Sequence, residues 1–162
     1  MNPTPEKTSV MPPFILMLFL YFIVGLFTVI NQQFQVPLKS ALLPHDGNMT
    51  NALVTLLNFS WFLAYPFSEG FATRWVDRLG YRKTSVYSLL IFIAGLGFYE
   101  AAVLLHIYAP SYITIMGNPI FTGFFIFLSG SFVIGMAVTI LQVVTGLYLD
   151  VNPVGKTTPL QR

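Results

Sequence analysis

The sequence predicts an all-α membrane protein with about four transmembrane helices, and three observations lead to that fold class. Only 9% of the 162 residues are charged and 55% are hydrophobic, whereas soluble domains carry about 25% charged residues. Sixteen Phe and eight Tyr residues supply aromatic bulk that is typical of membrane interfaces. The charged residues also leave long uncharged runs, and about 20 mostly apolar residues are enough for a helix to cross the hydrocarbon core.

The first uncharged run begins close to the start of the chain. No charged residue lies between Lys7 and Lys39, and this run predicts a first helix at about 13–34. The run is too long for the apolar part of a signal peptide, and no small-residue cleavage site follows it. Residues 1–12 are therefore expected to be a tail that precedes a retained helix.

Charges and turn residues set the limits of the next two helices. Prolines and polar residues at 37–48 predict a first loop. The uncharged run after this loop predicts a helix at about 50–73. The densest charged stretch, 74–83, predicts a second loop, and a third helix is expected at about 84–106.

The remaining chain predicts one more crossing. Ala109-Pro110 and Gly117-Asn118-Pro119 break the third helix. A fourth helix is expected at about 120–148, long enough to be tilted or frayed at one end. Residues 149–162 contain Pro, Gly, Lys and Thr and are expected to form a solvent-exposed loop or tail.

Basic residues near helix ends predict the orientation, because cytoplasmic segments of membrane proteins carry an excess of Lys and Arg. With the N-terminus inside, Lys39 is the only basic residue of the outer loops. The inner segments then hold seven of the eight basic residues, namely Lys7, Arg74, Arg78, Arg82, Lys83, Lys156 and Arg162. Both termini are therefore expected to be cytoplasmic, in an inner or plasma membrane.

Several function classes are excluded by missing motifs. The chain has no cysteine, which rules out disulfides and thiolate metal sites. It has no Gly-Lys-Ser/Thr phosphate loop, no His/Glu metal spacing and no nucleophile–base pair. We therefore expect no enzyme, no cofactor and no metal site, and the basic residues follow topology rather than nucleic-acid binding.

The charged stretch between the second and third predicted helices carries the most specific motif. It reads Arg-Trp-Val-Asp-Arg-Leu-Gly-Tyr-Arg-Lys over 74–83. Gly80 permits a tight turn, and Asp77 can pair with a neighbouring Arg or cap the next helix. The charges suit a positive-inside anchor or a conformational latch at one membrane face. The latch residues would be Asp77, Arg78, Gly80, Arg82 and Lys83.

This motif resembles the Asp-Arg-x-Gly-x-Arg-Lys signature of the major facilitator superfamily. The glycine found four residues before that Asp is replaced by Thr73 here. Segments 31–39 and 140–148, with Ala64-Tyr65-Pro66, are similar to the fucose–proton symporter and glucose/galactose transporter family. The resemblance covers nearly the whole chain. It implies that the four helices are part of the N-terminal six-helix bundle of a twelve-helix fold.

Amide side chains in the predicted spans are the candidate sugar-binding residues, because polar groups within a bilayer are costly and point to function. They are Asn31, Gln32, Gln33, Asn58 and Gln142. Gln142 lies on a stripe of small residues, so that packing between helices explains it equally well. The family often has acidic residues where this chain has Gln32 or Gln33 and Gln142. An amide can hydrogen-bond a sugar hydroxyl but cannot carry a proton.

Glu100 is the candidate for coupling, because it lies deeper in a predicted span than the other carboxylates. The alternative is that Glu100 lies near the outer headgroups and carries no proton.

The resulting hypothesis is the N-terminal portion of a hexose or deoxyhexose transporter, inactive alone as a monomer. Its expected partners are a small sugar, a coupling cation, the lipid bilayer, and the missing helices or a partner chain. One alternative is a membrane scaffold or subunit that does not transport. A self-assembling four-helix transporter is another, although such proteins usually carry a carboxylate in the first helix, which is absent here.

Overall fold

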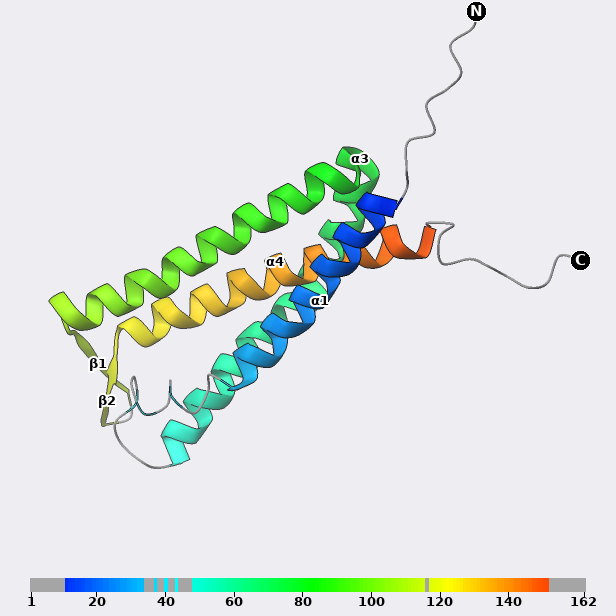
Figure 1. Cartoon of the computed structure of the whole chain (residues 1–162). Coiled ribbons are helices and arrows are strands. Elements are labelled where there is room, and N and C mark those ends of the chain that lie inside the picture. Colours follow the sequence, from blue (N-terminus) through cyan, green and yellow to red (C-terminus); the bar gives the residue numbers. More distant parts are fainter. Residues whose placement is uncertain are drawn as a thin grey trace, which may run out of the picture.

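A computed structural model describes residues 11–33, 37, 40, 43, 48–115 and 117–151. The described chain is a bundle of long helices that a small hairpin joins at one end (Figure 1). Its elements are α1 (Met11–Gln33), α3 (Asn48–Tyr108), β1 (Tyr112–Ile115), β2 (Asn118–Phe121) and α4 (Gly123–Val151). By length and composition, three of these helices could cross a membrane.

The middle helix, α3, consists of two segments that fold back on each other. With 61 residues, a straight helix would be about 90 Å long, three times the hydrocarbon core of about 30 Å. Gly80, at φ 77° and ψ 167°, interrupts the helical geometry, and the chain reverses direction there (Figure 1). We call 48–79 the first limb and 81–108 the second limb. The turn that the sequence predicts at Gly80 is present.

The charged stretch 74–83 differs from its prediction as a loop. It lies within α3, and all of it except Gly80 is helical, so the helical segments continue up to the turn. Arg, Leu and Lys are good helix formers, and nothing in this stretch breaks a helix except the glycine. Charges therefore mark where an apolar span ends, whereas the helix itself ends at Gly80.

The second predicted break is a β-hairpin, an element that the all-α prediction did not contain. Strands β1 and β2 pair antiparallel, with Tyr112 opposite Phe121 and Ile115 opposite Asn118. Gly117, between the strands, has a φ of 80°, in the left-handed region that glycine adopts readily. The β-branched and aromatic residues of β1 favour the extended conformation. The fourth helix consequently starts at Gly123 rather than near residue 120.

Helix α4 is the centre of the bundle and lies between α1 and the second limb (Figure 1). Small residues allow this close packing. A Cβ atom at Gly135 would lie 2.6 Å from the carbonyl oxygen of Trp61, and one at Gly130 would lie 2.8 Å from the ring of Tyr99. Glycine at both positions lets α4 approach the two limbs of α3 at once.

Two hydrogen bonds also join α4 to α3. The Ser60 hydroxyl donates to the carbonyl oxygen of Leu128 at 3.0 Å. The hydroxyls of Tyr99 and Ser131 lie 2.9 Å apart. These contacts attach both limbs of α3 to α4 within the apolar interior, where such bonds have no competition from water.

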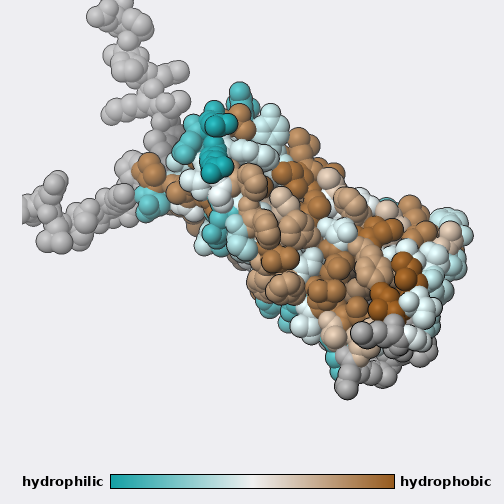
Figure 2. Space-filling view, turned by 180° about the vertical axis from the view of Figure 1, so that it is seen from behind, coloured by the Kyte–Doolittle hydropathy of each residue, from teal (hydrophilic) through white to brown (hydrophobic). Residues whose placement is uncertain are grey.

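The surface of the bundle is polar at one end and apolar along its length. Met11, the Gly80 turn and Val151 lie at the same end, and the hairpin lies at the other (Figure 1). Hydrophilic side chains gather at the first end, and hydrophobic side chains cover the middle (Figure 2). Only Met17 and Val24 are buried in α1, so that most of its large apolar side chains are exposed. Such a surface suits lipid rather than water.

Candidate functional site

A partly open cavity lies where α1, both limbs of α3 and α4 meet. Its volume is about 380 Å³, within the range typical of small-molecule sites. Five of its ten lining residues are aromatic, four are aliphatic and one, Asn31, is an amide. The polar and aromatic lining residues are Phe27, Asn31, Trp61, Phe92, Tyr99 and Phe127. We call this space the aromatic cavity.

The aromatic residues of the wall pack in pairs that connect different helices. Phe27 of α1 and Phe92 of the second limb have ring centroids 4.8 Å apart. Tyr99 of the second limb stacks on Phe127 of α4, with centroids 3.9 Å apart and nearly parallel planes. Such pairs add about 0.5–1.5 kcal/mol beyond their buried area. The cavity wall is therefore built from contacts that also stabilise the bundle.

Two polar groups in the first limb are buried without a hydrogen-bond partner among the described residues. They are the indole N–H of Trp61, a residue that is only 2% exposed, and the side-chain oxygen of Asn58. An unsatisfied buried donor or acceptor costs about 1–3 kcal/mol. Asn58 and Trp61 are three residues apart and share a helix face. Both atoms are closed off from solvent and Asn58 does not line the aromatic cavity, so a ligand would reach them only after neighbouring side chains move.

The structure brings together some of the predicted sugar-binding residues and separates others. Asn31 is half-buried and lines the aromatic cavity, and Asn58 lies one turn before Trp61. Gln32 and Gln33 are exposed on α1 and do not line the cavity.

Gln142 lies at another level of the bundle. Its neighbour Leu141 lies beside Leu20 in a smaller apolar cavity of about 100 Å³. Asn31 is eleven residues beyond Leu20, which is about 16 Å farther along α1. Gln142 is half-buried and is not among the residues of the aromatic cavity.

Trp61 and Tyr99 are cavity residues that the sequence analysis did not select. Among sixteen Phe and eight Tyr residues, no single ring stands out in the sequence. The signal that could have found Trp61 is its spacing from Asn58. An indole donor and an amide on one face of an apolar helix form an unusual pair.

The charged end of the bundle contains the predicted latch residues. Asp77, Arg78, Gly80, Arg82 and Lys83 are all exposed. Asp77 forms no ion pair within the described part of the chain. The Thr84 hydroxyl donates to the carbonyl oxygen of Gly80 at 2.9 Å and satisfies one backbone group at the turn. The cluster thus presents unpaired charges outward.

Glu100 lies one residue after Tyr99 but is exposed on the outer side of the second limb. It is not a lining residue of the aromatic cavity. Among the described residues, no three His, Asp or Glu side chains gather as a metal site would require.

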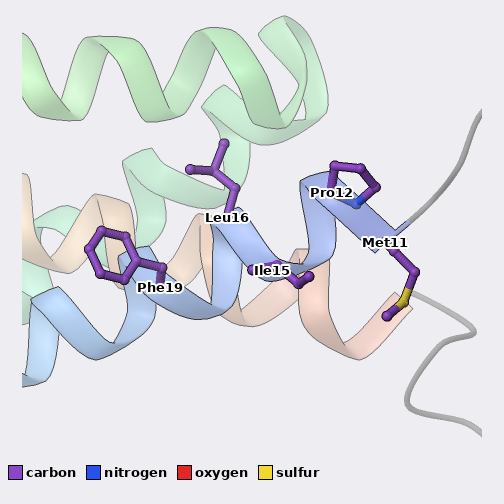
Figure 3. A pocket seen from close by; sticks show the side chains of 5 residues that line it. All are labelled: Met11, Pro12, Ile15, Leu16 and Phe19. Atoms are coloured by element: carbon purple, nitrogen blue, oxygen red, sulfur yellow. The ribbon is translucent and has the colours of Figure 1, made fainter.

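A larger hollow of about 550 Å³ lies against the first turns of α1. Figure 3 shows its lining side chains, Met11, Pro12, Ile15, Leu16 and Phe19, all from this one helix. All five are apolar, so the hollow lacks the convergent polar groups of a specific binding site. We do not assign it to the functional site.

Comparison with known proteins found no matching family model, no similar curated protein and no similar solved structure.

Proposed function

We propose that this chain is the N-terminal portion of a sugar transporter and that the sugar binds in the aromatic cavity. The observation that carries this proposal is the unpaired Trp61 N–H beside an aromatic wall. A sugar ring has apolar faces that pack on aromatic rings, and its hydroxyls need both donors and acceptors. Asn31 lines the cavity and offers both a donor and an acceptor. The buried donor of Trp61 and the buried acceptor of Asn58 would become available to the sugar when neighbouring side chains move.

The proposed fold is part of the N-terminal bundle of a major facilitator. Support comes from the Asp77-to-Lys83 motif and from the sharp turn at Gly80 within it. Secondary transporters of this kind rock two bundles around a central site. The exposed charges at the turn would pair with an opposing segment in one state and release it in the other. One bundle cannot alternate by itself, so transport by this mechanism requires an opposing bundle.

The proposed topology places the Gly80 turn and both chain termini on the cytoplasmic side of an inner or plasma membrane. Four exposed basic residues gather near this turn, namely Arg74, Arg78, Arg82 and Lys83. The positive-inside tendency favours this orientation. The hairpin of β1 and β2 then faces the opposite side.

Coupling to a proton would need a group other than the amides. Gln32, Gln33 and Gln142 cannot exchange protons, and Glu100 lies outside the aromatic cavity. We therefore propose that sugar binding at the cavity does not depend on protonation of these amide positions.

The test uses the fluorescence of Trp61 in the full chain, reconstituted in lipid nanodiscs. The chain has two tryptophans, so Trp75→Phe leaves Trp61 as the only indole. Titration with hexoses or deoxyhexoses should shift the emission of Trp61, and this shift should saturate as the sugar concentration rises. Trp61→Phe keeps a ring and removes the donor, and sugar affinity measured by calorimetry should fall about tenfold.

The matched control is Trp75→Phe, which lies near the charged turn and should leave affinity unchanged. Absence of saturable binding for every sugar, with the helical content intact, would contradict the proposal. That outcome would favour the alternative of a membrane scaffold or subunit, for which the long exposed apolar face of α1 is the supporting observation.

A further inference from the structure

The second limb of α3 has a regular outer face opposite the one that packs on α4. Its inner face buries Thr84, Ser88, Gly95 and Ala102. Most positions of this limb are exposed, and one stripe of them runs along the outer face at alternating spacings of four and three. The residues of this stripe are Val86, Leu90, Ile93, Gly97, Glu100, Leu104 and Ile107, and we call them the outer seam.

A stripe with the spacing of the outer seam can serve as a helix–helix interface. An alternation of four and three gives a period of 3.5 residues, which keeps one stripe facing a partner helix along its whole length. Ile93 and Ile107 are each 63% exposed, so no described segment covers the seam. A Cβ atom at Gly97 would have no atom within 4 Å. The seam is thus open to close approach by another backbone.

Glu100 is the one charged member of this apolar stripe. It lies about 12 Å along the axis from Tyr108 and about 25 Å from Lys83. Tyr108 and Tyr112 are exposed at the hairpin end, where aromatic side chains typically meet the membrane interface. With Tyr108 at the interface, Glu100 would lie at hydrocarbon depth. Carboxylates at that depth are costly, and they almost always face a partner or a water-filled cavity.

The chain itself supplies no matching positive charge at that level within its described part. Arg74, Arg78, Arg82 and Lys83 all lie at the Gly80 turn, at the far end of the limb. A second copy aligned in parallel would have these basic residues at the same far end, so it would bring none of them level with Glu100. The occupant that fits the seam is consequently a different helix, with a positive charge level with Glu100.

We propose that the outer seam is the docking face for a transmembrane helix that carries a basic side chain at the depth of Glu100. The apolar residues of the seam interdigitate with that helix, and Gly97 allows close approach. The Glu100 carboxylate pairs with the base and sets the register, as one polar residue in an apolar interface does. This surface is separate from the aromatic cavity, so the inference holds whether or not the cavity binds sugar.

The experiment uses the full chain in phosphatidylcholine vesicles with synthetic Leu/Ala transmembrane peptides as probes. One peptide has a single Lys at the depth of Glu100, and the other has Leu there. The photo-crosslinking amino acid benzoylphenylalanine replaces Leu104, beside Glu100 on the seam. In the control it replaces Phe98, which is 42% exposed on the same helix but off the seam.

We expect the crosslinking yield at Leu104 to be about fivefold higher for the Lys peptide than for the Leu peptide. Glu100→Gln, which keeps the shape of the side chain and removes the charge, should abolish this difference. The Phe98 position should not discriminate between the peptides. Because Glu100 is exposed, the variant should fold normally, and helical content measured by circular dichroism checks this.

Two outcomes would overturn the proposal. Equal yields for the Lys and Leu peptides at Leu104 would show that the charge does not select the partner. Crosslinks mainly between two copies of this chain would show that the seam is a self-association surface instead.

Discussion

At the residue scale, Gly80 determines how the long helix α3 folds. Its φ of 77° and ψ of 167° fall in a region that is essentially restricted to glycine. Helical residues lie on both sides of it, so a single set of torsion angles reverses the chain. The neighbouring charges surround this turn and do not create it, because their side chains are exposed.

Replacement of Gly80 by Ala should therefore destabilise the bundle by about 1–3 kcal/mol. Asn should not rescue it, since Asn tolerates the left-handed helical region but not this combination of angles. Gly70→Ala is the control, because that glycine is helical and a Cβ there meets nothing within 4 Å. Denaturant unfolding in detergent micelles measures both variants. Equal stability of Gly80→Ala and Gly70→Ala would contradict the described turn.

At the scale of elements, α4 holds the bundle together because it contacts both limbs of α3 and α1. Val24, Trp61 and Ile134 belong to one buried cluster that joins three helical segments. The same contact positions Trp61 at the aromatic cavity, so that packing of α4 and geometry of the site are linked.

A Gly135→Ala substitution should disturb that link. The new Cβ would lie 2.6 Å from the backbone oxygen of Trp61, and backbone cannot yield as a flexible side chain can. Overpacking of this kind costs about 1–3 kcal/mol, and it should also shift the emission of Trp61. Gly146→Ala, on the same helix with nothing within 4 Å, should change neither. An unaltered unfolding midpoint in Gly135→Ala would argue against this helix contact.

At the scale of the whole molecule, the described chain has a charged end and a hairpin end, with an apolar surface between them (Figures 1 and 2). Each limb of α3 is long enough to cross a membrane once, because the first limb (48–79) has 32 residues and the second limb (81–108) has 28. This arrangement would place the Gly80 turn and the hairpin on opposite sides of a bilayer.

Single cysteines can test that arrangement, because the chain has none of its own. Arg78→Cys at the turn and Thr114→Cys in the hairpin are both at exposed positions. In oriented membrane vesicles, a membrane-impermeant maleimide should label them from opposite sides, with Arg78→Cys on the cytoplasmic side. Labelling of both from one side would mean that the second limb does not span the membrane.

The sequence by itself determined the properties that depend on neighbours along the chain. Uncharged runs predicted the long apolar helices, and Gly80 within a charged stretch predicted the turn. The extent of α3 through 74–79 and the hairpin at 112–121 were not predicted. Charged and turn-forming residues predicted a polar break in each of these two segments. Whether each segment formed a helix or strands depended on the local conformational propensity of its residues.

Only the tertiary structure decided which polar groups meet. Asn31 of α1 and Trp61 of the first limb are far apart in the sequence, and the packing of α4 brings their helices around one cavity. Gln142 has the same chemistry as Asn31 but lies at another level of the bundle. Glu100 is exposed because α4 covers the opposite face of its helix. Chemistry can be read from residue types, but proximity and exposure follow from which helix faces pack together.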